Sequence, residues 1–266
     1  MTELEKLRIV TGYEFLKHFR RARLYIILGL TLLAELLVLI LVPVLGDGFP
    51  DNVLVMAAML SIGPSLATIG AIFFAGDAIA GEFESKTGFI LFTNPVGRAT
   101  LVIGKYLACF AAVALLVILG YVISSISLLV IYGNVPFETL SSFGLCLLYA
   151  ASVVSVTFFF SSISKGSMAA TVITLVFIMV ISGIIDSILT MTGQPHWFML
   201  SNNGDTIATV YGGYELFLGG FGSSGGDMIP FEFEDPNIGL AVLSMVIYLV
   251  VGFVASIWIT RRRQLA

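Results

Sequence analysis

The stretch LYIILGLTLLAELLVLILVPVL, residues 24–45, is an unbroken apolar run in which Glu35 is the only charged residue. The hydrocarbon core of a bilayer is about 30 Å thick, so a helix needs roughly 20 apolar residues to cross it. Strands of a membrane β-barrel alternate between apolar and polar residues, and this run does not alternate. It therefore predicts a membrane-spanning helix, which satisfies its backbone hydrogen bonds internally.

The composition of the whole chain agrees with this first helix. Of the 266 residues, 58% are hydrophobic and 11% are charged, whereas a soluble domain has about 25% charged residues. The net charge of −4 argues against a nucleic-acid binder, and a disulfide scaffold is excluded because both cysteines lie in apolar runs. We predict an all-α integral membrane protein that forms a single transmembrane domain over residues 1–266. Its six spans are expected at residues 24–45, 53–76, 106–132, 139–162, 168–191 and 238–260.

The positions of the basic residues predict the orientation. All 13 lysines and arginines lie before the first span, between spans two and three, between spans four and five, or after span six. The other three connections contain aspartates and glutamates but no lysine or arginine. The positive-inside rule then places both termini in the cytoplasm of a multi-pass protein in the cell membrane. An odd number of spans would scatter the basic residues over both sides, so the pattern also supports six.

Residues 1–23 are predicted to form a cytoplasmic amphipathic helix. Its basic residues are suited to lipid head groups, and its apolar residues to the membrane surface. Two roles remain open for it: a topology anchor, and an interfacial helix that responds to the movement of a cytoplasmic partner. The apolar residues are Leu4, Leu7, Val10, Phe15, Leu16 and Phe19, and the basic ones are Lys6, Lys17, Arg20, Arg21 and Arg23.

The segment DAIAGEFESKTGFILFTNPVGRATLVIGK, residues 77–105, is longer than a connection between two adjacent spans requires. Its centre, residues 82–92, is expected to form a short helix that Asn94 and Pro95 end. Two glutamates near the start of this helix precede a group of apolar residues. This arrangement is typical of a helix that docks into a groove on another protein.

The order of residues in this segment resembles the cytoplasmic loop of ABC-2 type transporter permeases. Lys86 and Gly97 depart from the family pattern, which has a glycine and a serine there. Residues 13–15 and 20–24 are similar to the family's N-terminal connecting helix, and residues 261–265 to its basic tail. The matching loop positions are Asp77, Ile79, Glu82, Glu84, Thr87, Pro95, Val96, Arg98, Gly104 and Lys105.

This resemblance implies the membrane subunit of an ATP-binding-cassette (ABC) exporter, with the substrate pathway in this chain. The sequence has no G-x-x-x-x-G-K-[ST] phosphate-binding loop, so we expect no ATPase site and no cofactor here. ATP and magnesium would bind a separate ATP-binding subunit. A second permease chain is implied as well, in a homodimer or a heterodimer. The resemblance assigns coupling to the ATP-binding subunit to Asp77, Glu82, Glu84, Thr87, Phe89, Pro95, Arg98 and Lys105.

Glu35 lies at the midpoint of the first predicted span, where a charge is costly. We expect it to be protonated, or hydrogen-bonded to a neighbour such as Thr31 one turn earlier. It is either an element of a substrate or ion route, or a helix–helix hydrogen bond at the interface between permease halves. The first interpretation carries an alternative function, an ion-coupled secondary transporter that uses Glu35 as its proton site.

Small polar residues recur at helical spacing in the second span. Ser61, Ser65 and Thr68 are candidates for a polar pathway, although such residues also allow helices to pack closely. Pro64 should bend this span, because it removes a backbone donor and crowds the preceding turn.

Residues 192–237 are predicted to form an outer segment of short helices at the membrane surface. Residues 222–226 fit the nucleophile pattern G-x-S-x-G, but no strand precedes them, so an intramembrane hydrolase with His196 as base is disfavoured. Met191, His196 and Met199 are residue types that bind copper(I). They follow no clear ligand pattern, and we predict no metal site.

Overall fold

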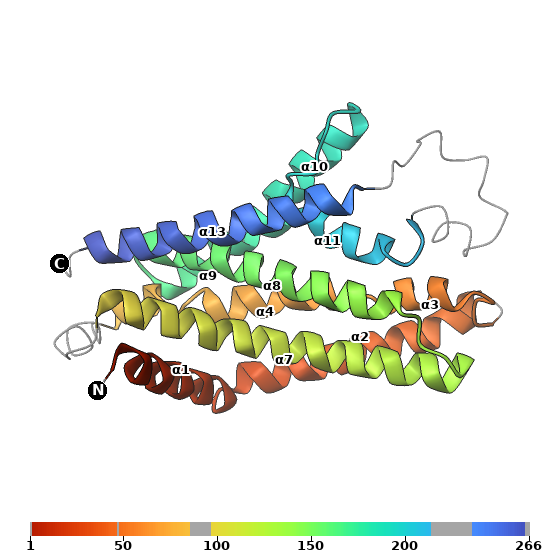
Figure 1. Ribbon diagram of the computed structural model, residues 1–266, viewed down its shortest axis with the longest axis horizontal. Coiled ribbons are helices and arrows are strands. Elements are labelled where there is room, and N and C mark those ends of the chain that lie inside the picture. Colours follow the sequence, from red (N-terminus) through yellow and green to blue (C-terminus); the bar gives the residue numbers. More distant parts are fainter. Residues whose placement is uncertain (1, 47, 86–96, 214–235, 264–266) are drawn as a thin grey trace.

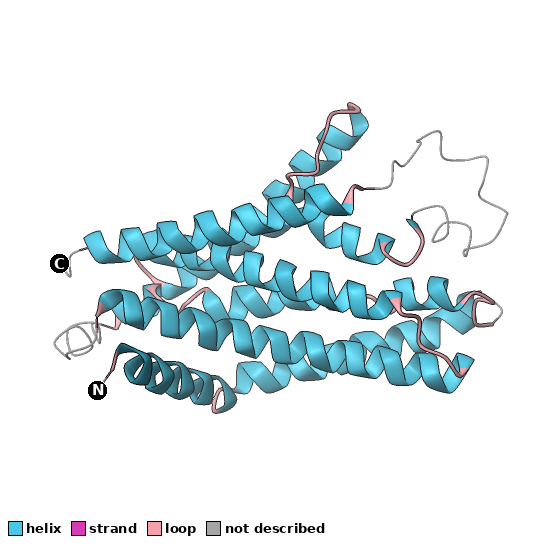
Figure 2. Cartoon of the chain, viewed as in Figure 1, coloured by secondary structure: helices cyan, strands magenta, loops and turns pink. Residues whose placement is uncertain are grey.

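The computed structural model describes residues 2–46, 48–85, 97–213 and 236–263. Within these ranges every regular element is a helix, and the long helices lie side by side along one axis (Figures 1 and 2). Both chain ends lie at the same end of this bundle (Figure 1). Six helical segments are long and apolar enough to cross a membrane, which confirms the predicted all-α, six-span fold.

The chain enters the bundle through two consecutive helices. α1 (Glu3–Phe19) begins with a capping box, in which the Thr2 hydroxyl accepts a hydrogen bond from the Glu5 backbone N–H and the Glu5 carboxylate accepts one from that of Thr2. α2 (Ala22–Leu45) follows after a short turn and forms the first span. Many of its large apolar side chains are exposed, so α2 lies at the periphery of the bundle.

The second span is interrupted twice. We expected Pro64 to bend it, and the structure has a full break immediately before this residue. Pro64 lies in the first helical turn after the break, where the missing N–H leaves no helical hydrogen bond unmade. A glycine precedes it at position 63, because a Cβ there would lie 2.7 Å from the Tyr121 ring. The three pieces are α3 (Val53–Met59), α4 (Gly63–Ala75) and α5 (Ala80–Glu84).

Three long helices supply spans three, four and six: α7 (Arg98–Tyr132), α8 (Glu138–Ile163) and α13 (Ile238–Arg262). α8 and α13 pack closely, since a Cβ on Gly252 would lie 2.9 Å from the Ser155 carbonyl carbon. Residues 98–105, which we predicted to lie in the connecting segment, instead form the first turns of α7. They contain no proline, so the helix extends back to Gly97, whose backbone is extended.

The fifth span changes its helical geometry in the middle. α9 (Ser167–Leu175) continues into a π-helical turn (Val176–Ile181) and then into α10 (Ser182–Met191). The segment that follows, which we predicted to be an outer segment, contains α11 (Leu200–Thr209). Leu200 and Ile207 of this helix are buried in the main core, so α11 is packed into the fold. The glycine-rich residues 222–226 lie outside the described residues.

The main hydrophobic core lies between α4, α7 and α8. Its fully buried side chains include Ala71 of α4, Val113 and Leu116 of α7, and Val153 and Phe158 of α8. Small residues at many of these positions let the helix axes approach closely. The close packing fixes the ends of these helices relative to one another, and it thereby positions the charged residues at those ends.

Candidate functional site

The end of the bundle that carries both termini is also its basic end. The described lysines and arginines lie in α1, at the start of α2, in the first turns of α7, in the α8–α9 connection or at the end of α13. We call this region the basic end. Four of the residues that we predicted for partner coupling lie here within one cluster.

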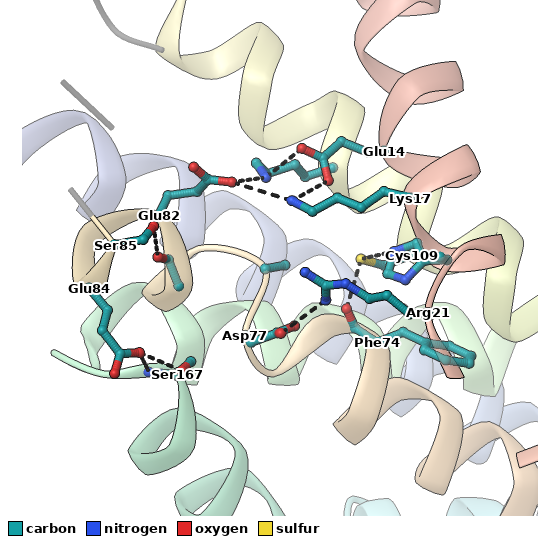
Figure 3. Close-up of a pocket in the computed structure, with 14 residues that line it drawn as sticks. Glu14, Lys17, Arg21, Phe74, Asp77, Glu82, Glu84, Ser85, Cys109 and Ser167 are labelled. Atoms are coloured by element: carbon teal, nitrogen blue, oxygen red, sulfur yellow. Dashed lines mark hydrogen bonds and ion pairs between the residues drawn. The ribbon is translucent and has the colours of Figure 1, made fainter. Parts of the chain in front are cut away.

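A cavity of about 430 Å³ opens at the basic end, between α1, the α4–α5 turn, α5, α7 and the start of α9 (Figure 3). Charged side chains of both signs surround it. They are Glu14, Lys17, Arg21, Asp77, Glu82, Glu84 and Lys105.

Lys105 is the most buried of these charges, with 7% of its side chain exposed. Its Nζ lies 2.7 Å from Glu14 Oε1 and 2.8 Å from Glu82 Oε1. Lys17 Nζ lies 3.5 Å from Glu14 Oε2 and 3.7 Å from Glu82 Oε1. A buried ammonium needs paired carboxylates to offset its lost hydration. Together these ion pairs join α1, α5 and α7.

A second ion-pair group joins α2 to the α4–α5 turn. Asp77 Oδ2 accepts hydrogen bonds from Arg21 Nη1 at 3.1 Å and from Arg23 Nη2 at 2.7 Å. Arg23 Nη1 also donates to the Phe73 carbonyl at 2.8 Å. Lys17, Arg21 and Arg23, which we predicted to be suited to lipid head groups, are 35–40% exposed, and each also has an acidic partner distant in sequence.

Glu84 caps the N-terminus of α9. Its Oε2 accepts a hydrogen bond from the Ser167 backbone N–H at 2.7 Å and another from the Ser167 hydroxyl. The residue at the N-cap position, Gly166, has no side chain to do this. A carboxylate at a helix N-terminus also interacts favourably with the helix dipole.

His18 fills the interior wall of the cavity as a neutral side chain. Burial, followed by the nearby charge of Arg21, lowers its pKa from 6.5 to about 4. Its ring packs against Phe74, and its Nε2 lies 3.6 Å from Cys109 Sγ, which donates to the Phe74 carbonyl. His18 therefore has a packing role at neutral pH. The sequence analysis missed the contact between His18 and Cys109. It also missed the role of Glu14, for which the only indication was that Lys105 borders an apolar run and needs an acidic partner.

The structure thus brings Asp77, Glu82, Glu84 and Lys105 together around one cavity. Arg98 lies apart from it and donates to the carbonyls of Arg261 and Arg263 at the end of α13, both at 3.3 Å. The remaining predicted coupling residues, Thr87, Phe89 and Pro95, lie outside the described residues.

Glu35 is buried inside the bundle, with 1% of its surface exposed. Its Oε1 lies 2.9 Å from Ser124 Oγ of α7, and its Oε2 has no hydrogen-bond partner among the described residues. Glu35 thus has a hydrogen-bonded neighbour, as we expected, but this neighbour is Ser124 and not our example Thr31, whose hydroxyl donates to the Ile27 carbonyl of its own helix. Glu35 therefore joins α2 to α7 within one chain.

The three candidate pathway residues of the second span do not share one environment. Ser65 is exposed, whereas Thr68 is buried and bonded to the Pro64 carbonyl and the Tyr149 hydroxyl. Ser61 lies in the break between α3 and α4. Within one chain these residues do not line a common surface.

Met191, His196 and Met199, whose residue types can bind copper(I), lie in or beside the connection between α10 and α11. His196 Nδ1 lies 3.2 Å from the Gln194 carbonyl, and Met191 is 75% exposed. Across the described ranges, no group of three histidine, cysteine or acidic side chains is arranged to hold a metal.

Comparison with known proteins identifies the family. Residues 12–181 match the family described as ABC-2 family transporter protein. The probable ABC transporter permease protein NosY of Pseudomonas aeruginosa is 32% identical over 88 residues, which cover 33% of this chain and 32% of the relative. The protein of the same name from Stutzerimonas stutzeri is 34% identical over 74 residues, 28% of this chain and 27% of the relative. These two matches span about a third of the relatives' length or less. The family match covers more than half of this chain, and the chain therefore belongs to the ABC-2 family of transporter proteins.

Proposed function

We propose that this chain is the membrane subunit of an ABC exporter that a separate ATP-binding subunit drives. The observation that carries the proposal is the cluster at the basic end. There the motif residues Asp77, Glu82, Glu84 and Lys105 converge on α5, a short helix at the surface of a six-span bundle. A short helix at the end of a bundle can be displaced by a bound protein, and its contacts then transmit this movement to the spans.

The basic end faces the cytoplasm in this proposal, and both termini lie there. The distribution of lysine and arginine supports this orientation, because such residues are retained on the cytoplasmic side during insertion. ATP is available on that side only. The ATP-binding subunit therefore contacts α5 and the residues that follow it, and α1 lies beside that contact.

The contacts of Glu82 and Glu84 within the chain bear on their role in docking of the ATP-binding subunit. Both carboxylates are engaged within the chain, Glu82 with Lys105 and Glu84 with Ser167. We infer that they hold α5 in position for the partner, in addition to any direct contact they make with it. Closure of the ATP-bound partner then moves α5, and tilting of the spans opens the pathway outward.

The substrate pathway lies between two permease chains in this proposal. Ser65 is exposed on the outside of the bundle and Thr68 is buried inside it, so a single chain offers these residues no shared lining. A second copy, or a related permease, placed against the exposed face would complete the pathway.

The test is co-purification of the affinity-tagged chain from its native membrane. We expect an ATP-binding subunit to accompany it and the complex to hydrolyse ATP. Glu82→Lys with Glu84→Lys should insert normally, since the added charge is positive on a cytoplasmic segment, and should lose the partner and its ATPase activity. Purification of the wild-type chain without any ATP-binding subunit, or without ATPase activity in the complex, would overturn the proposal.

A second candidate function rests on the burial of Glu35 and its partnerless Oε2. Intramembrane carboxylates mark proton routes in many transporters. In an ion-coupled secondary transporter, the reconstituted chain alone would respond to a pH gradient without ATP, and Glu35→Gln would abolish that response. Proton flux in vesicles that contain this chain and no ATP-binding subunit distinguishes the two functions.

A further inference from the structure

Three consecutive residues of α5 contact three different parts of the bundle. Glu82 pairs with Lys105 of α7 at 2.8 Å. The Phe83 ring lies under the guanidinium of Arg263, which follows α13, with 4.2 Å between the guanidinium carbon and the ring centroid. Glu84 binds Ser167, the first residue of α9. α5 is thus attached separately to the third, sixth and fifth spans.

Arg263 directly follows α13 and contacts the end of α8 as well as the Phe83 ring. Its Nη1 donates to the Ser162 carbonyl in the last turn of α8 at 2.9 Å. A cation is favourable at a helix C-terminus, where the last carbonyls have no intrahelical partner. Arg98 donates in turn to the Arg263 carbonyl at 3.3 Å, which helps to fix the backbone of Arg263. Arg263 therefore links α5 to the ends of α8 and α13.

The contact between Glu84 and Ser167 links α5 to the whole fifth span. α9, the π-helical turn and α10 form one continuous helical segment from Ser167 to Met191. The carboxylate bonds the first backbone N–H of this segment at a solvent-exposed position. While this bond holds, a displacement of Glu84 moves the start of the fifth span with it.

A helix of five residues has little stability of its own, because helix formation starts from an unfavourable nucleus. The position of α5 therefore depends on its attachments to the rest of the bundle, which also include the bond from the Ala80 backbone N–H to Ser161 Oγ of α8. The buried ion pair between Glu82 and Lys105 is the strongest of these attachments, since breaking a buried pair is costly. When a bound protein displaces α5, the helix therefore rotates about Glu82, and Phe83 and Glu84 move.

We propose that Arg263 and Glu84 are positioning residues that transmit the movement of α5, Arg263 to the sixth span and Glu84 to the fifth. This inference rests on the proposed function, in which an ATP-binding subunit moves α5. Each residue serves a different span, so their effects are separable. A merely structural role would affect both spans together through general loosening of the fold.

The experiment measures two distances in the complex with its co-purified ATP-binding subunit, with and without Mg-ATP, by pulsed electron spin resonance. One spin-label pair joins Val130→Cys at the far end of α7 to Ile238→Cys at the far end of α13, and the second joins Val130→Cys to Met191→Cys at the end of α10. All three sites are exposed. The natural cysteines, Cys109 and Cys146, are buried and so resist labelling.

In the wild type we expect both distances to change with Mg-ATP. Arg263→Gln should reduce the switched population in the α7–α13 pair roughly two- to fivefold, the effect of losing a cation–π contact at an exposed site, and leave the α7–α10 pair unchanged. Glu84→Gln should reduce the switched population in the α7–α10 pair and leave the α7–α13 pair unchanged. Arg262→Gln is the matched control, because Arg262 stacks on Trp258 of its own helix. Phe83→Leu removes the Arg263 contact from the other side and repeats the test if Arg263→Gln folds poorly.

The positioning roles are overturned if both variants keep the partner and show the wild-type distance changes, or if each variant reduces both changes equally. In either case the proposed function stands, because the partner still binds and drives movement. If the wild-type complex contains no ATP-binding subunit, or shows no distance change with Mg-ATP, the proposed function fails and the positioning roles fail with it.

Discussion

Replacing Lys105 by methionine should destabilise the basic end more than any other single charge removal there. Lys105 Nζ lies 2.7 Å from Glu14 and 2.8 Å from Glu82, and 7% of its side chain is exposed. Removing one partner of a buried ion pair costs about 3–5 kcal/mol, because the remaining charge is left buried without a partner. Lys17 lies 3.5 Å from Glu14 and offsets part of this loss. We therefore expect about 3 kcal/mol, the lower end of the range.

The assay is thermal unfolding of the purified chain in detergent. A loss of about 3 kcal/mol lowers the midpoint by roughly 6–12 °C in a chain of this size. Lys165→Met is the matched control, since Lys165 is exposed in the α8–α9 connection and its loss should have little effect. Adding Glu14→Gln and Glu82→Gln to Lys105→Met should recover most of the loss, because no buried charge then lacks a partner. Equal midpoints for Lys105→Met and Lys165→Met would refute the reasoning.

Three further predictions address other parts of the chain. Burial lowers the pKa of His18 to about 4, so the unfolded chain binds more protons there between pH 6.5 and 4. Stability should fall by up to about 3 kcal/mol as the pH drops through this window, and His18→Gln should flatten that part of a plot of midpoint against pH. Ser124→Ala removes the hydroxyl beside Glu35 and should cost about 1 kcal/mol in a denaturant titration; no loss would mean that the contact is not formed. Gly63→Ala places a methyl 2.7 Å from Tyr121 and should cost about 1–3 kcal/mol, whereas Gly144→Ala, which meets nothing within 4 Å, should cost much less.

The six spans could be predicted from the sequence because their signal is local. A long apolar run identifies a span wherever the rest of the chain goes, and the observed segments differ from the predicted ones mainly at their ends. The clearest difference lies at the start of α7, where residues 98–105 extend the helix beyond the apolar run. Composition marks the limit of the membrane, whereas a helix ends at a capping or breaking residue, here Gly97.

The partners of the buried polar residues could not be predicted in this way. The Glu35 carboxylate meets Ser124, and Lys105 meets Glu14, across 89 and 91 positions of sequence respectively. The local candidate for Glu35, Thr31, uses its hydroxyl on the carbonyl one turn earlier, as threonines in helices commonly do. Only the packing of α2 and α1 against α7 brings the distant partners into reach.

The contacts at the basic end also suggest why the family resemblance includes charged residues. Asp77, Glu82 and Lys105 are each paired within the chain, and Glu84 caps α9. A motif that served only to contact a partner would need no such internal bonds. We therefore expect a substitution at any of these positions to displace α5 even in the isolated chain. Hydrogen exchange of the α5 amides in Asp77→Asn, measured without the ATP-binding subunit, should be faster than in the wild type, because the bonds to Arg21 and Arg23 that fix the preceding turn lose their charge assistance. Unchanged exchange would mean that Asp77 does not hold α5, and its role would then have to lie in direct contact with the partner.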